Sequence, residues 1–127
     1  MSRVGVIDIT GISTPSGSWG TYRIFYYTKI KTIDELRFCE RTFDYYGNEF
    51  TNAEIENLNA TGVIANNKLD FSTCKKLTHD SLMSIINILK DFSGTEETRS
   101  ITFGATNLAK LSDTEKAIAT QKGWTLA

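Results

Sequence analysis

Apolar and polar residues alternate near the start of the chain, with the period of two that is typical of β-strands. Residues 4–10, Val-Gly-Val-Ile-Asp-Ile-Thr, show this alternation, and residues 21–28 are rich in aromatic residues that favour strands. Residues 11–20 contain the only proline and three glycines, which predicts a loop or wide turn. We therefore expect the two strands to pair as an antiparallel hairpin, so that residues 1–31 form an N-terminal β-hairpin region.

The period changes to three and four residues in the second half of the chain, as on one face of an α-helix. Residues 79–90 carry apolar side chains at this spacing, and Thr78 stands where an N-cap would begin the helix. The apolar residues that give the spacing are Leu82, Ile85, Ile86 and Leu89. This is the best-defined helix that the sequence predicts.

Two capping boxes predict further helices. Thr51 and Glu54 have the spacing at which a hydroxyl and a carboxylate each bind a backbone amide of the first turn. This pair predicts a short helix over about residues 52–60. Ser112 and Glu115 repeat the spacing and predict a last helix near the C-terminus.

Three apolar-x-Phe triplets recur along the chain. They are Leu36-Arg37-Phe38, Leu69-Asp70-Phe71 and Ile101-Thr102-Phe103, and each is followed by a turn and a helical pattern. Stacked strand–helix units with parallel strands would bury these residues in one continuous core, as in a solenoid. We expect residues 32–127 to form such units within a single compact domain, with Trp124 folding back as a C-terminal plug.

The second and third triplets extend into a longer pattern that resembles the core of leucine-rich repeats. Leu69-x-Phe71-x-x-Cys74-x-x-Leu77 matches it well, and Ile101-x-Phe103-x-x-Thr106 matches it with threonine at the asparagine or cysteine position. The first triplet departs from the pattern at Arg41. The resemblance implies that Cys74 and Thr106 are buried and bind backbone groups in the turn. The expected fold is therefore α/β: an N-terminal β-hairpin followed by a short leucine-rich-repeat-like strand–helix solenoid.

A narrower resemblance covers residues 68–127. The runs Lys76–Asn87 and Asn107–Ala127 are similar to leucine-rich-repeat-like segments at the C-terminal end of phage and prophage tail or baseplate proteins of gut bacteria. The resemblance implies a non-enzymatic binding or structural protein that is associated with the tail fibre or baseplate. The alternative is a small phage-encoded inhibitor that binds a host protein, such as a defence enzyme, in the cytoplasm.

Composition and charge narrow the classes of partner. The formal net charge is −1 and no basic cluster is present, which argues against a nucleic-acid binder. No apolar run approaches the roughly 18 residues of a membrane span. The N-terminus lacks the apolar segment of a signal peptide. Together with this, the resemblance to phage tail proteins implies a location in the virion or in the bacterial host cytoplasm.

The sequence contains no constellation that predicts catalysis. Cys39 and Cys74 fit no metal-ligand spacing, and we expect both to be buried free thiols. A disulfide between them is the alternative. His79 is the only histidine and is expected at the surface of a first helical turn, so neither a zinc site nor a cofactor is indicated. Two of four nearby carboxylates could act as a catalytic pair for glycoside hydrolysis if they face each other across a cleft. A solvated acidic face is the simpler interpretation. The four carboxylates are Glu35, Glu40, Asp44 and Glu49.

Aromatic residues in the first 50 positions are the best candidates for binding. Tyrosine and tryptophan anchor interfaces because they bury a large area and keep a polar tip, and their rings also stack on sugars. The candidates are Trp19, Tyr22, Tyr26, Tyr27, Tyr45 and Tyr46. The alternative is that about half of them belong to the core. The expected partner is a protein or a surface glycan, and self-association is left open.

Overall fold

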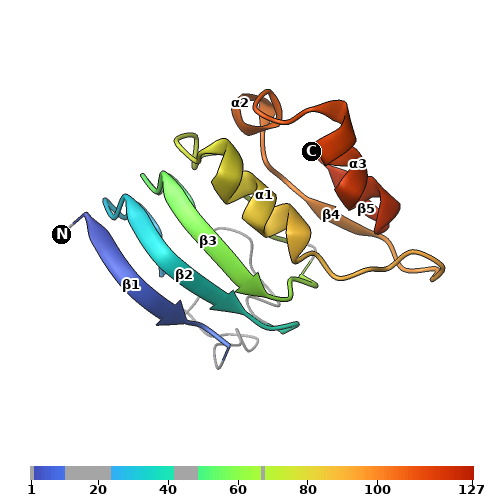
Figure 1. The fold of residues 1–127 in the computed structure, drawn as a ribbon, viewed down its shortest axis with the longest axis horizontal. Coiled ribbons are helices and arrows are strands. Elements are labelled where there is room, and N and C mark those ends of the chain that lie inside the picture. Colours follow the sequence, from blue (N-terminus) through green and yellow to red (C-terminus); the bar gives the residue numbers. More distant parts are fainter. Residues whose placement is uncertain (1, 11–23, 42–48, 67) are drawn as a thin grey trace.

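The structure is a computed structural model, and it describes residues 2–10, 24–41, 49–66 and 68–127. Strands dominate the first half of the chain and helices the second (Figure 1). In chain order the elements are β1 (Arg3–Asp8), β2 (Thr32–Phe38), β3 (Asn57–Gly62), α1 (His79–Asn87), β4 (Arg99–Ile101), α2 (Ala105–Leu108), α3 (Asp113–Gln121) and β5 (Trp124–Leu126). The protein is therefore α/β.

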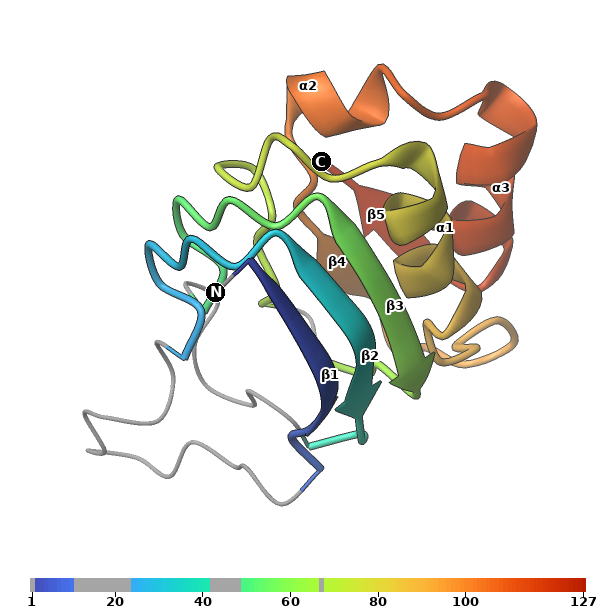
Figure 2. The same cartoon turned by 60° about the vertical axis from the view of Figure 1, so that its left-hand side comes forward.

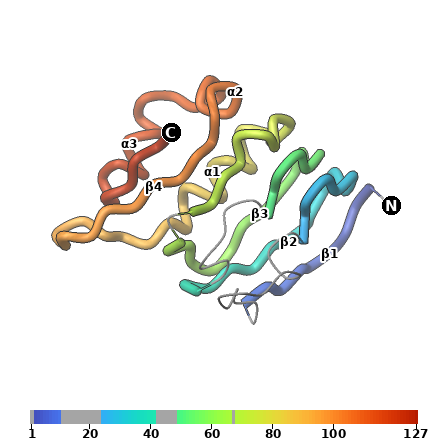
Figure 3. Tube along the Cα trace, turned by 180° about the vertical axis from the view of Figure 1, so that it is seen from behind, coloured from blue at the N-terminus to red at the C-terminus, as the bar shows by residue number. Residues whose placement is uncertain are grey.

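All the strand pairs among the described residues are parallel. β1, β2 and β3 form one sheet in that order, and β4 and β5 form a second. Helices α1 and α3 continue the row that β1–β3 begin, with α1 packed on β3 and α3 beside α1 (Figure 1). β4 and β5 lie in a second layer behind this row (Figure 2), and Figure 3 shows the same order from behind. Buried apolar residues from Ile9 to Trp124 form one core between the layers.

The predicted N-terminal hairpin is wrong. β1 pairs in parallel with β2, which places Val4 opposite Ile33 and Ile7 opposite Leu36. Residues 24–27 form a turn instead of a strand. Only Phe25 of this turn is buried, and the backbone bond from the Thr28 amide to the Phe25 carbonyl closes the turn.

Four phenylalanines from successive parts of the chain stack in the core, and we call them the phenylalanine ladder. Neighbouring ring centroids lie 5.1, 4.6 and 6.0 Å apart. The ladder consists of Phe25, Phe50, Phe71 and Phe103, each 0–2% exposed. The expected equivalence of the first triplet with the other two is therefore wrong, because Phe38 lies on β2, whereas Phe71 and Phe103 follow Phe50 in the ladder.

The predicted helix over 52–60 is also wrong, since this stretch leads into β3. Glu54 does not close a capping box. Its backbone amide donates to the carbonyl of Thr28 at 2.9 Å, and its carboxylate accepts from Lys76 Nζ at 3.1 Å. Leu58 and Ala60 are buried at alternate positions, so a strand buries this segment's apolar residues against the core.

Three local predictions are confirmed. Thr78 caps α1 by accepting from the amide of Ser81, and α1 is three residues shorter than predicted. The second capping box forms at the start of α3. Trp124 is buried at 2% exposure in β5, and its indole Nε1 donates to the carbonyl of Lys90 at 2.8 Å.

The turn residues that the repeat resemblance implies are partly corrected. Cys74 is buried, and burial raises the pKa of its thiol to about 11. Thr106 is exposed, and the buried side chain is that of its neighbour Asn107. Neither Cys74 nor Cys39 forms a disulfide, and Cys39, half-buried, donates to the carbonyl of Thr10 at 3.0 Å.

Candidate binding surface

Residues Ile24–Tyr27, which we call the aromatic turn, display three large apolar side chains at the surface. Ile24 is 41% exposed, Tyr26 39% and Tyr27 57%. The two tyrosine rings pack edge to face, with centroids 4.5 Å apart and planes at 74°. Such a pair presents a rigid apolar surface with polar tips, which suits recognition of a protein or a sugar.

The aromatic turn is anchored by core packing and by backbone hydrogen bonds to the next segment of the chain. Phe25 stacks on Phe50 in the ladder, and its amide donates to the carbonyl of Glu49 at 3.2 Å. The amide of Tyr27 donates to the carbonyl of Thr51 at 2.9 Å. The exposed rings are therefore presented by a backbone that is bonded to the next segment of the fold.

Tyr27 has a backbone conformation that disfavours its side chain. Phe25 O accepts from the amide of Thr28 at 3.1 Å, which closes a β-turn with Tyr27 as its third residue at φ 57°. Left-handed φ at this position favours glycine or asparagine. The next rung of the ladder supplies the comparison, because the equivalent residue in the turn after Phe50 is Asn52, at φ 52°.

Two of the six predicted binding residues, Tyr26 and Tyr27, are therefore exposed together. The others lie outside the residues that the structure describes. These are Trp19, Tyr22, Tyr45 and Tyr46. Ile24 and Val6, the latter 56% exposed on β1, are further exposed apolar side chains that the aromatic criterion did not find.

The expected acidic face is wrong for one of its members. Glu49 is completely buried, and its carboxyl oxygens have no hydrogen-bond partner among the described residues. Burial raises the pKa of Glu49 to about 8, so this group is protonated at neutral pH. Glu35 and Glu40 do form surface ion pairs, and Asp44 lies outside the described residues. No sequence signal distinguishes Glu49 from the others.

His79 lies at the surface of the first turn of α1, as predicted, but it also connects two helices. Its Nε2 lies 2.5 Å from Glu115 Oε2 on α3, and its Nδ1 lies 3.3 Å from Asp80 Oδ1. The hydrogen bond to Glu115, and to a smaller extent the one to Asp80, raises the pKa of His79 above its ordinary value of 6.5. Glu115 also accepts from the amide of Ser112, so one carboxylate serves both the capping box and the histidine.

We expect the pKa of His79 to fall when Glu115 is replaced by glutamine, because the main acceptor for the charged imidazole is lost. His79 is the only histidine, so an NMR titration of its ring protons reads the pKa directly. Since the folded pKa is raised, the pair stabilises the fold at low pH and loses this effect as pH rises through that pKa. Glu96→Gln, in the exposed loop before β4, is the control. An unchanged pKa in the Glu115→Gln variant would contradict the contact.

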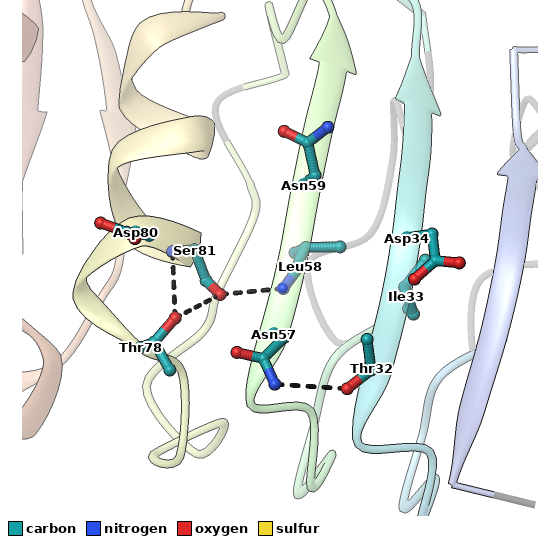
Figure 4. Close-up of a pocket in the computed structure, with 9 residues that line it drawn as sticks. All are labelled: Thr32, Ile33, Asp34, Asn57, Leu58, Asn59, Thr78, Asp80 and Ser81. Carbon is teal, nitrogen blue, oxygen red and sulfur yellow. Dashed lines mark hydrogen bonds between the residues drawn. The ribbon is translucent and has the colours of Figure 1, made fainter.

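A polar hollow of about 260 Å³ lies where β2 and β3 meet the N-terminus of α1 (Figure 4). Its side chains belong to elements that are fixed by the parallel sheet and by the cap at Thr78. No group of three or more histidine, cysteine or acidic side chains able to hold a metal ion occurs within the described part of the chain. In the same part, no helix is long and apolar enough to cross a membrane.

The chain was compared with protein-family models, curated proteins and solved structures, and none of the three comparisons found a match.

Proposed function

We propose that this chain is a non-enzymatic binding protein that contacts a protein or a surface glycan through the aromatic turn. The proposal rests on the backbone conformation and the exposure of Tyr27. A tyrosine at positive φ with most of its side chain exposed contributes less to the fold than an asparagine would. A residue that costs stability and stays exposed is best accounted for by what it contacts.

The proposed scaffold is a short leucine-rich-repeat-like solenoid. The parallel strand pairs and the phenylalanine ladder support it, since each recurs between neighbouring segments. The buried Asn107 supports it too, because its side chain bonds the carbonyl of Cys74 in the preceding turn. The proposed setting is the tail fibre or baseplate of a phage or prophage, which rests on the resemblance of residues 68–127. In such an assembly the scaffold would display the aromatic turn to a virion component or a host surface.

The test is Tyr27→Asn, which copies the residue found at the equivalent position of the next turn. We expect the free energy of unfolding to rise by about 1 kcal/mol because the strain at positive φ is relieved. We also expect binding to be lost because the exposed ring is gone. Chemical denaturation measures the first effect. The second is measured by capture on immobilised protein from lysates of prophage-induced cells and of the uninduced host.

The matched control is Asn52→Gly, which changes the same backbone position one rung along and leaves the aromatic turn intact. It should keep every partner that the wild type captures. If Tyr27→Asn keeps all of them too, the proposal is wrong. Capture of a virion component favours the tail setting, whereas capture of a host protein from uninduced cells favours the inhibitor.

The solution mass of the purified chain, measured by light scattering, separates the same two settings. Tail fibres and baseplates are built from symmetric oligomers, so a stable trimer or larger ring favours the tail setting. A monomer favours the inhibitor.

A further inference from the structure

The polar hollow differs in chemistry from the aromatic turn. The buried side chains of Ile33 and Leu58 lie beneath it, and its remaining lining is polar. Figure 4 shows that the polar side chains come from the outer face of β2 and β3 and from the start of α1. The polar lining residues are Thr32, Asp34, Asn57, Asn59, Thr78, Asp80 and Ser81.

Four of these side chains lie on the same face of two neighbouring strands. Thr32 lies opposite Asn57, and the next outward residues are Asp34 on β2 and Asn59 on β3. The register shifts between Ile33 and Leu36, so β2 carries one extra residue in this interval. Such bulges re-aim side chains and are frequent next to functional sites.

Several hydrogen-bonding atoms in the hollow are left for a ligand. The side chain of Asn59 is exposed and forms no hydrogen bond with any residue that the structure describes. Asn57 donates from Nδ2 to Thr32 Oγ1 at 3.2 Å, which leaves its carbonyl oxygen as an acceptor. Asp34 binds Arg3 through Oδ1 at 2.9 Å, which leaves Oδ2. The side chains are thus oriented by the fold while part of their hydrogen-bonding capacity stays unused.

The charge of the hollow selects against anions. No lysine or arginine is among its described lining residues, and the carboxylate of Asp80 is fully exposed at its rim. The charge of Asp34 is compensated by Arg3 from β1. A ligand that suits this surface is neutral and offers several hydroxyls to carboxamide and carboxylate groups.

We propose that this hollow binds one ring of a neutral carbohydrate. Neighbouring strands are about 4.8 Å apart and alternate residues of one strand about 6.6 Å apart, a spacing comparable to that of hydroxyls across a sugar ring. Asn59 and Asp34 contact hydroxyls on different sides of the ring, and the aliphatic carbons of the lining side chains face its C–H groups. The inference rests on the proposed binding function for its setting, but it uses residues that the aromatic turn does not contain.

The test is an NMR titration that follows the side-chain amide signals of Asn57 and Asn59. The probes are glucose, galactose, mannose, rhamnose, N-acetylglucosamine and N-acetylgalactosamine at millimolar concentrations. We expect at least one sugar to shift these signals, equally at low and high salt because the ligand is neutral. We expect Asn59→Leu, a change at an exposed strand position, to weaken binding at least tenfold. Asn87→Ala, on the exposed side of α1, is the matched control and should bind as the wild type does.

The result separates this inference from the function proposed for the aromatic turn. Shifts that persist unchanged in the Tyr27→Asn variant and disappear in Asn59→Leu support the hollow. If no sugar in the panel shifts the two asparagine amides, or if the shifts survive in Asn59→Leu, the inference is wrong. Shifts confined to the backbone of residues 24–28 would also overturn it while supporting the aromatic turn as a glycan contact. A response to a cationic amine alone, weakened by salt, would overturn it as well.

Discussion

Replacing Glu49 with glutamine is expected to remove a large part of the pH dependence of stability. In the folded protein, burial raises the pKa of Glu49 from its ordinary 4.5 to about 8. Between these values the folded state holds a proton that the unfolded state releases. The free energy of unfolding therefore falls by about 1.4 kcal/mol for each pH unit, or roughly 5 kcal/mol across the window. Stability from this group is greatest below pH 4.5 and is lost as pH rises through 8.

The measurement is urea denaturation of the wild type and of Glu49→Gln at pH 5, 6.5 and 8. The glutamine does not titrate, so the difference between the two proteins should grow in favour of the variant as pH rises. Glu54→Gln is the control with the opposite sign, because the hydrogen bond from Lys76 lowers the pKa of the half-buried Glu54 carboxylate. Parallel pH profiles for the wild type and Glu49→Gln would show that Glu49 is not buried in its neutral form.

Replacing Asn107 with alanine is expected to lower the free energy of unfolding by about 2–4 kcal/mol. Asn107 is completely buried, and its Nδ2 lies 3.1, 3.2 and 2.9 Å from the carbonyl oxygens of Phe71, Cys74 and Phe103. Its Oδ1 accepts from Lys110 Nζ at 3.1 Å. Removal of the carboxamide takes a side-chain donor from three carbonyls in the core, of which that of Phe71 still accepts from the amide of Cys74 at 2.9 Å.

The neighbouring Thr106 supplies the control for Asn107. Thr106 is exposed, so Thr106→Ala should change the unfolding free energy by less than about 0.5 kcal/mol. Asn107→Asp should be at least as damaging as the alanine, since a carboxylate would face three carbonyl oxygens. If Asn107→Ala is as stable as Thr106→Ala, the three bonds do not hold the two turns together.

The elements that the sequence predicted correctly are those whose signals are local. Thr78 and Ser112 mark helix starts because each cap is bonded within its own first turn. Glu54 has the same spacing from Thr51, yet its carboxylate pairs with Lys76, 22 residues away. Spacing along the chain carries no information about such a distant partner, so the helix expected there is a strand.

The repeat was misaligned for a related reason. Phe38 and Phe71 share a triplet pattern, but the ring that precedes Phe71 in the ladder is that of Phe50. The ladder residues are unevenly spaced along the chain, which hides them from any search for a fixed period. The repeat pattern, counted from Phe103, places Thr106 at the turn position. In the fold, the short helix α2 follows Phe103 and turns Asn107 into the core.

The candidate sites also divide into residues that the sequence reveals by type and residues whose role depends on the fold. Tyr26 and Tyr27 could be found because aromatic residues are recognisable by type, although their positive-φ turn could not. Nothing in the type of Glu49 distinguishes it from a solvated glutamate. The polar hollow depends on the register of β2 against β3, which places Thr32 opposite Asn57 and brings Asp34 and Asn59 to the same face. A register of one residue more or less would turn these side chains away from each other.

The row of elements has a consequence for how the molecule opens. β1 contacts β2, β2 contacts β3, β3 contacts α1, and α1 contacts α3, each through its neighbour in the row. Local openings of the ends therefore need not disturb the middle, and we expect amide hydrogen exchange to be slowest in β3 and α1 and faster toward β1. A partner on the aromatic turn would slow exchange at the β1 end first, so exchange rates alone would locate it along the row.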